Sequence, residues 1–350
     1  MSFEVPVVDV APWVDVEAYD DEARARVVRE LDDACRSVGF IQVLGHGVPE
    51  AAVDGLASAM DDFFGLPLDD KLALKVPANR GYSAPRSESL SLSLGVESAN
   101  RMNDFFEAFN VGVEARSFPG LFLDEADYGL NVWPDVPGFQ ERVEAYFAEA
   151  GRVARTLLRV FAVALELPAD HFEALTDHSI DVLRMNNYAL PPGEVTLDGE
   201  LTGMGEHTDF GLVTVLWADR VAGLQVLAGD GGWHDVSPVD GALLVNLGDL
   251  TARLTNDRWS STLHRVKPPV VDGRIVRRRS AAYFHDGNVD AVLATLPSHL
   301  DARAWGGAPD SAYGPVSVRD HIAAKLAGSR QGRINVSAVR EAARVLASRD

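Results

Sequence analysis

The stretch GEHTDF, residues 205–210, places a histidine two positions before an aspartate. The run that follows, LVTVLW at 212–217, is rich in β-branched and aromatic residues and predicts a strand. Side chains two positions apart on a strand point to the same face of the sheet. We therefore expect the imidazole of His207 and the carboxylate of Asp209 to project together into the space that the sheet encloses.

A further histidine, His264, lies in STLHRV at 261–266, which also predicts a strand. The chain between Asp209 and His264 is long enough for several strands to leave this region and return to it. Two imidazoles and one carboxylate on one side of a metal ion leave coordination positions open. That arrangement suits non-haem Fe(II) and O₂.

Four segments surround these residues: GDL at 248–250, LTND at 254–257, WSSTLHRV at 259–266 and RRSAAYF at 278–284. Together with His207 and Asp209, they closely resemble the isopenicillin N synthase-like family of Fe(II)/2-oxoglutarate-dependent oxygenases. Members of this family carry His-x-Asp, a distal His in a Ser-Thr-x-His-Arg-Val setting, and Arg-x-Ser before an aromatic strand. The resemblance implies that His207, Asp209 and His264 are the metal ligands and form the catalytic centre.

The 350 residues are 47% hydrophobic and 24% charged, a composition typical of a globular protein. We find no repeat and no linker, and we predict one oxygenase domain over 1–350. Short strands and turns alternate between 182 and 284, with hairpin signals at 230–232 and 272–273. We expect a mainly β fold with flanking α: a double-stranded β-helix (jelly-roll, cupin-like) core at 180–290, an N-terminal helical and strand region at 1–120, and C-terminal helices at 291–350.

Apolar periodicity predicts the flanking elements. Strands are expected at 5–10, 40–44, 105–111 and 182–188, and helices at 20–38, 49–64, 137–167, 316–327 and 335–348. The segment around FIQVLGHGV, residues 40–48, resembles the N-terminal region of the same family. His46 lies between two glycines at a turn there, and we expect it to be structural.

The formal net charge of −20 disfavours binding to phosphate backbones, so we expect no nucleic-acid partner. No run of 18 apolar residues could span a membrane, and the start of the chain has no secretory pattern. The single cysteine, Cys35, excludes an intrachain disulfide and favours a cytoplasmic location. Without a heptad or a long exposed stripe, a monomer or weak dimer is expected.

The co-substrate 2-oxoglutarate would chelate the metal through its 2-oxo group and one carboxylate. Its distal carboxylate then needs a cation, and Arg278 offers a planar fork for it. Ser280 shares the same strand face, whereas Arg277 and Arg279 would point away. The resemblance adds Tyr188 and Asn186, although the chain between Tyr188 and His207 and that between His264 and Arg278 are longer than is usual in the family.

Residues 76–103 are rich in Ser, Gly and Asn, and the resemblance puts this segment near the substrate, with Tyr82 and Asn103 as candidate contacts. The implied enzyme requires Fe(II), 2-oxoglutarate and O₂, with ascorbate as a supporting reductant. It would couple oxidative decarboxylation of 2-oxoglutarate to hydroxylation, desaturation or cyclisation of a small molecule. Three alternatives remain: an oxidase of the same fold that uses no 2-oxoglutarate, a non-catalytic ligand-binding module, and an isomerase or hydrolase using another metal.

Overall fold

The structure is a computed structural model that describes residues 3–76, 79–94, 104–189, 203–271, 274–297, 311–331 and 335. The N-terminal part contains β1 (Val7–Asp9), α1 (Ala11–Val14), α2 (Asp21–Ser37), β2 (Phe40–Leu44), α3 (Glu50–Phe64), α4 (Leu68–Leu72) and β3 (Gly81–Ser83). It continues through the 3₁₀ helix η1 (Leu90–Leu94), β4 (Glu107–Gly112), the 3₁₀ helix η2 (Ala115–Ser117), α5 (Phe139–Ala164) and α6 (Glu173–Thr176).

The rest of the chain is mostly strand. It contains β5 (Val182–Tyr188), β6 (Met204–His207), β7 (Val213–Ala218), β8 (Leu224–Leu227), β9 (Trp233–Asp235), β10 (Leu243–Leu247), α7 (Asp249–Leu254) and β11 (His264–Val266). After these come β12 (Val270–Val271), β13 (Arg274–Ile275), β14 (Arg278–His285), β15 (Val292–Leu293), β16 (Val316–Ser317) and α8 (Val318–Gln331).

Two sheets form the core. The larger has the order β1-β2-β10-β7-β14-β5-β4-β3, and the smaller has the order β6-β11-β8-β9. All neighbouring strands in these two sheets are antiparallel except the pair β1 and β2. This is the arrangement of a jelly-roll core, and the expected fold class is confirmed.

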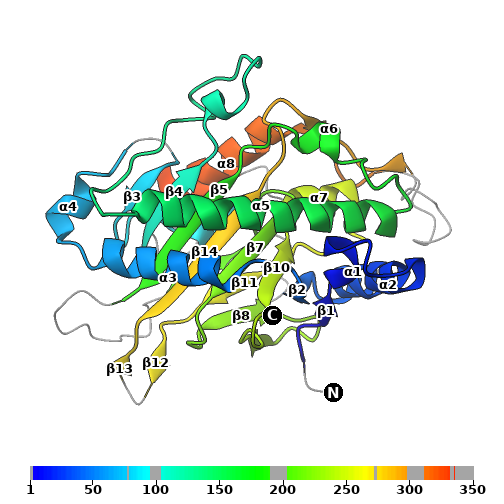
Figure 1. Ribbon diagram of the computed structural model, residues 1–350, viewed down its shortest axis with the longest axis horizontal. Coiled ribbons are helices and arrows are strands. Elements are labelled where there is room, and N and C mark those ends of the chain that lie inside the picture. Colours follow the sequence, from blue (N-terminus) through cyan, green and yellow to red (C-terminus); the bar gives the residue numbers. More distant parts are fainter. Residues whose placement is uncertain are drawn as a thin grey trace.

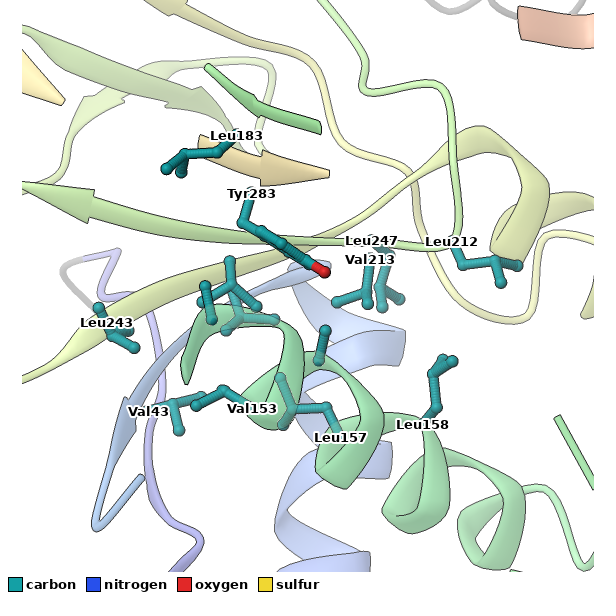
Figure 2. Close-up of a cluster of buried hydrophobic side chains, with 14 of the residues drawn as sticks. Val43, Val153, Leu157, Leu158, Leu183, Leu212, Val213, Leu243, Leu247 and Tyr283 are labelled. Atoms are coloured by element: carbon teal, nitrogen blue, oxygen red, sulfur yellow. The ribbon is translucent and has the colours of Figure 1, made fainter. Parts of the chain in front are cut away.

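Helices α3 and α5 run beside each other across one face of the large sheet, and α2 packs against α5 (Figure 1). The amphipathic pattern of α5 explains this packing, because its apolar stripe faces the strands. Figure 2 shows Val153, Leu157 and Leu158 of α5 directed toward the buried side chains of the sheet. The helical layer therefore covers one face of the large sheet, and the small sheet is left to enclose the other.

Leu157 provides a test of this packing, because its side chain is completely buried. Leu157→Ala should lower the free energy of unfolding by about 2–5 kcal/mol, since it removes buried apolar contacts and leaves a cavity. Chemical denaturation followed by circular dichroism measures the change. Leu130→Ala is the matched control, because Leu130 is 58% exposed and its truncation should have little effect. Equal losses in the two variants would contradict this account of the core.

The predicted elements outside the catalytic region agree with the structure to within a few residues, and Cys35 is buried on α2 as expected. The hairpin signal at 230–232 connects β8 to β9. One detail is wrong: β6 ends at His207, so Asp209 lies in the connection to β7 and not on a strand beside His207. The hairpin predicted at 272–273 joins β12 to β13, which pair antiparallel, although its two turn residues fall outside the described residues. The helix at 335–348 also falls outside them, apart from position 335.

Candidate active site

His207, Asp209 and His264 are brought together between the two sheets. Their ligand atoms all lie within 4.8 Å of one another, and all three residues are buried. Asp209 Oδ1 is 3.8 Å from His207 Nε2 and 3.7 Å from His264 Nε2. The strand pairing explains the position of the two imidazoles, because His264 on β11 lies directly opposite His207 on β6.

Hydrogen bonds fix how each imidazole is presented. His207 Nδ1 donates to the carbonyl of Gly205 at 2.7 Å, and His264 Nδ1 donates to the carbonyl of Thr262 at 3.0 Å. With the proton on Nδ1, the lone pair of Nε2 is available to a metal. Burial and the neighbouring His264 lower the pKa of His207 to about 3, so this imidazole is neutral at physiological pH.

The carboxylate of Asp209 is held by the large sheet. Its Oδ2 accepts hydrogen bonds from Asn246 Nδ2 at 2.7 Å and from Thr214 Oγ1 at 2.5 Å. Asn246 on β10 and Thr214 on β7 are paired residues, so adjacent strands present the two donors together. This leaves Oδ1 directed toward the two imidazoles, where it can act as a monodentate ligand.

A second carboxylate, Asp249, ties the ligand segments to the C-terminal helix. Its Oδ2 accepts from Thr208 Oγ1 at 3.0 Å, and its Oδ1 accepts from Ser261 Oγ at 2.7 Å. Lys325 of α8, which is almost completely buried, lies 2.6 Å from Oδ2. Removing one partner of such a buried pair is strongly destabilising, so the pair can hold α8 against the ligand segments.

Arg278 at the start of β14 is also buried, with only 2% of its surface exposed. Its Nε donates to the carbonyl of Val221 at 3.2 Å, but its Nη1 is buried and has no hydrogen-bond partner among the described residues. Nor does any carboxylate in the described part of the chain lie within ion-pair distance of it. A buried, unpaired guanidinium is costly, and an anionic ligand would complete it.

The other three expected co-substrate residues surround this guanidinium. Tyr188 lies opposite Arg278 in the β5–β14 pairing, and Asn186 lies opposite Ser280. The guanidinium carbon of Arg278 is 5.1 Å from the centre of the Tyr188 ring. Burial raises the pKa of Tyr188, and Arg278 and the Ser280 hydroxyl partly offset that rise, so the phenol is protonated and able to donate.

One cavity contains the ligand candidates and the co-substrate candidates. Its lining includes His207, Asp209 and His264 together with Arg278, Ser280, Asn186 and Tyr188. The large sheet and the small sheet both contribute to the wall, and so does α8 through Ile322 and Leu326.

Two other residues considered from the sequence, Tyr82 and His46, do not line this cavity. Tyr82, expected near the substrate, is 2% exposed in the helical core, and its hydroxyl donates to Glu107 at 2.7 Å. Its ring packs against Phe63, because strand β3 directs it toward the helical layer. Asn103 falls outside the described residues. His46 is structural, as expected: it is hydrogen-bonded to the carbonyl of Gly241 and to the amide of Val48.

Sequence reasoning gave no role to the residues that position the ligands. Asn246 and Thr214 could have been noticed as polar residues within apolar strand runs. Their shared contact with Asp209 depends on strand register, however, which the sequence does not specify. Asp249 lies in the segment GDL at 248–250, but no pattern in the sequence distinguishes Lys325.

The donor set fits a divalent metal ion. Histidine nitrogen and carboxylate oxygen atoms bind first-row metals at about 2.1 Å, so two of them can be at most about 4.2 Å apart across one ion. The distances of 3.7 and 3.8 Å from Asp209 satisfy this limit. Two histidines and one carboxylate share this cavity with an unpaired arginine, an arrangement suited to a non-haem metal ion and an anionic ligand.

Comparison with known proteins agrees with this class. Residues 5–136 match the family described as non-haem dioxygenase in morphine synthesis N-terminal, and residues 180–287 match the 2OG-Fe(II) oxygenase superfamily. A 2-oxoglutarate-Fe(II) type oxidoreductase, hxnY, of Emericella nidulans is 35% identical, with 91% of this chain and 88% of the relative covered. The validamycin A dioxygenase of Streptomyces hygroscopicus subsp. limoneus is 32% identical over 92% of this chain and 87% of its own.

Solved structures give the same result. A full-length Neurospora crassa protein, in complex with alpha-KG and 5-formyluracil, superposes with a TM-score of 0.77 and 25% identity, over 92% of this chain and 96% of that chain. JOX2, in complex with 2OG, Fe and JA, superposes with a TM-score of 0.71 and 26% identity, over 95% and 88%.

The chain belongs to the 2OG-Fe(II) oxygenase superfamily, as its isopenicillin N synthase-like motifs implied. It is a 2-oxoglutarate- and Fe(II)-dependent dioxygenase that uses O₂ to oxidise a small molecule. The oxidase and the binding-module alternatives are not favoured. No helix in the ranges that the structure describes is long and apolar enough to cross a membrane.

Proposed function

We propose that His207, Asp209 and His264 hold the Fe(II), and that Arg278 binds the distal carboxylate of 2-oxoglutarate. The observation that carries the second assignment is the buried guanidinium of Arg278, whose Nη1 has no partner in the described part of the chain. Ser280 and Tyr188 would each donate a further hydrogen bond to the same carboxylate. Asn186 forms the cavity wall beside them.

In this proposal the protein acts by holding the metal ligands in fixed orientations. The Nδ1–carbonyl bonds of the two histidines orient both rings so that Nε2 faces the metal site, and Asn246 and Thr214 hold one oxygen of Asp209 away from the metal. Bound Fe(II) supplies the site at which O₂ oxidatively decarboxylates 2-oxoglutarate to succinate and CO₂, with oxidation of a substrate C–H bond. Apolar residues around the ligands exclude water from that step. Hydroxylation, desaturation and cyclisation are all compatible with this site.

Succinate formation tests the assignment without knowledge of the substrate. Purified protein supplied with Fe(II), ascorbate, O₂ and 2-oxoglutarate should form succinate slowly by uncoupled turnover. Omitting Fe(II) or adding a chelator should stop it. An enzyme of the oxidase type would form no succinate and would bind no 2-oxoglutarate when loaded with metal.

We further propose that residues 1–350 act as one domain, which is supported by the packing of β1 and β2 into the core sheet and by the contribution of α8 to the cavity.

The net charge of −20 supports a monomer or weak dimer without a nucleic-acid partner. The proposed location is the cytoplasm, without a membrane partner, supported by the single, buried Cys35. A stable tetramer in light scattering would contradict the proposed oligomeric state.

A further inference from the structure

A second cluster of polar side chains lines the same cavity, on the side built by β4, β5 and α8. Its members are Asn79, Glu88, Asn110, Arg184 and Arg330. Arg184 lies opposite Ala282 on β14 and opposite Asn110 on β4. Ala282 is four residues along the strand from Arg278, a separation of about 13 Å at 3.3 Å per residue. The cluster therefore lies apart from Arg278 along the strand, although it borders the co-substrate residues, because Arg184 Nε donates to Asn186 Oδ1 at 3.2 Å.

One carboxylate, that of Glu88, lies within ion-pair distance of both arginines of this cluster. Glu88 Oε2 is 2.8 Å from Arg184 Nη2, and its Oε1 is 3.5 Å from Arg330 Nε. Burial opposes ionisation of Glu88, but the two guanidiniums hold the pKa of its carboxyl below the ordinary value. Within the described ranges neither arginine has another carboxylate at ion-pair distance. Two guanidiniums thus share one carboxylate at ion-pair distance. A second buried carboxyl, Asp104, interacts with Arg184 from farther away, and burial raises the pKa of Asp104 to about 6. A ligand carboxylate would pair with the two guanidiniums directly.

Asn110 adds an unused acceptor to the same wall. It is 2% exposed, and its Oδ1 has no hydrogen-bond partner among the described residues. Its Nδ2 donates to Asn79 Oδ1 at 2.8 Å, and that oxygen also accepts from Arg330 Nη2 at 2.6 Å. Reversing the amide would set two oxygens against each other, so the orientation is determined. Buried acceptors are normally satisfied, and this one calls for an N–H or O–H group.

Apolar side chains complete the wall of the cavity, namely Val182, Phe284, Ile322 and Leu326. Asp286 also lines it, and burial raises the pKa of this carboxyl well above its ordinary value. A molecule that fills the cavity therefore meets cations at one end and apolar surface over much of the rest.

We propose that the substrate is a small monocarboxylate with an N–H or O–H group beside the carboxylate, bound by Arg184, Arg330 and Asn110. Its apolar remainder would extend toward the metal ligands. Glu88 would keep the two guanidiniums oriented and would not contact the substrate carboxylate. This inference rests on the proposed function, because it takes the oxidised C–H bond to lie at the metal centre.

Matched pairs of acids and amides test the substrate class. The protein, loaded with Mn(II) and saturated with 2-oxoglutarate, would be titrated calorimetrically with 2-hydroxy acids bearing side chains from methyl to benzyl. Each acid is compared with its primary amide. Saturation keeps the acids from competing at Arg278. At least one acid should bind about tenfold or more tightly than its amide, because only the acid makes charge-assisted bonds. If no acid in the series exceeds its amide, the inference is overturned.

Arg330→Gln is the preferred variant, because it leaves the Glu88–Arg184 pair in place. It should weaken binding of the acid about tenfold and leave binding of the amide nearly unchanged. Arg184→Gln, if it folds, should act in the same direction. Arg279→Gln is the control, since Arg279 is paired with Asp61 outside the cavity. Equal weakening of acid and amide in Arg330→Gln would indicate a merely structural role and overturn the inference.

Uncoupled succinate formation separates this inference from the proposed function. It should be unchanged in the control Arg279→Gln, because Arg279 lies outside the cavity and its replacement leaves the metal ligands, Arg278 and the polar cluster intact. A wild-type protein that forms no succinate would contradict the proposed function. Succinate formation without any preference for acids would contradict this inference alone.

Discussion

Replacing His264 with alanine should abolish tight Fe(II) binding and reduce succinate formation to background. The substitution removes one of three protein ligands, and loss even of residues that only orient ligands typically costs 10–100-fold in metal affinity or activity. We therefore expect a loss of at least about 100-fold in Fe(II) affinity. Anaerobic competition with a chromogenic chelator measures the affinity directly, and succinate release measures the consequence for turnover.

His234→Ala is the matched control for this experiment. His234 is a partly exposed histidine of the same small sheet, and its imidazole contacts Asp230 outside the cavity. It should retain wild-type iron affinity and turnover. Asp209→Ala and His207→Ala should behave as His264→Ala does. Full iron binding in any of the three ligand variants, with a native circular dichroism spectrum, would exclude that residue as a ligand.

Local patterns in the sequence were sufficient to predict most of the elements. The apolar periods of 20–38, 49–64 and 137–167 predicted α2, α3 and α5, because each of these helices buries one continuous stripe. The connection that holds Asp209 was not predicted, because alternation on a strand continues only as far as the hydrogen-bond ladder does. Here the ladder of β6 ends at His207, and the backbone of Asp209 follows a turn held by the amide of Asp249.

The residues of the site also fall into two groups: those that a local motif identifies, and those that depend on contacts between distant segments. The ligand candidates and Arg278 lie within short motifs, so the sequence was sufficient to identify them. Residues that act across strands or helices carried no such pattern. Arg330 reaches Glu88 across a separation of more than 200 residues, and its contact depends on how α8 docks. Tyr82 illustrates the opposite error, because a residue in a loop-rich segment was expected near the substrate and is packed in the core.

Replacing Arg278 with alanine should leave Fe(II) binding intact and raise the KM for 2-oxoglutarate about 30-fold or more. Truncating one partner of a buried, hydrogen-bonded charge pair costs roughly 2–5 kcal/mol, and the lower figure already corresponds to about 30-fold. Arg278→Lys should recover only part of the affinity, because an ammonium group does not reproduce the planar fork. Initial rates of succinate formation over a range of 2-oxoglutarate concentrations give the KM.

Thermal stability gives an independent measurement of the same interaction. A ligand at 100 times its Kd stabilises the folded state by about 2.7 kcal/mol, so saturating 2-oxoglutarate should raise the Tm of the Mn(II)-loaded wild type. That rise should be largely absent in Arg278→Ala. It should be retained in Arg279→Ala, because Arg279 is the next residue on β14 and its guanidinium pairs with Asp61 and Asp219 outside the cavity. A full rise in Arg278→Ala would show that the distal carboxylate is bound elsewhere. The unpaired guanidinium of Arg278 would then have to serve the substrate.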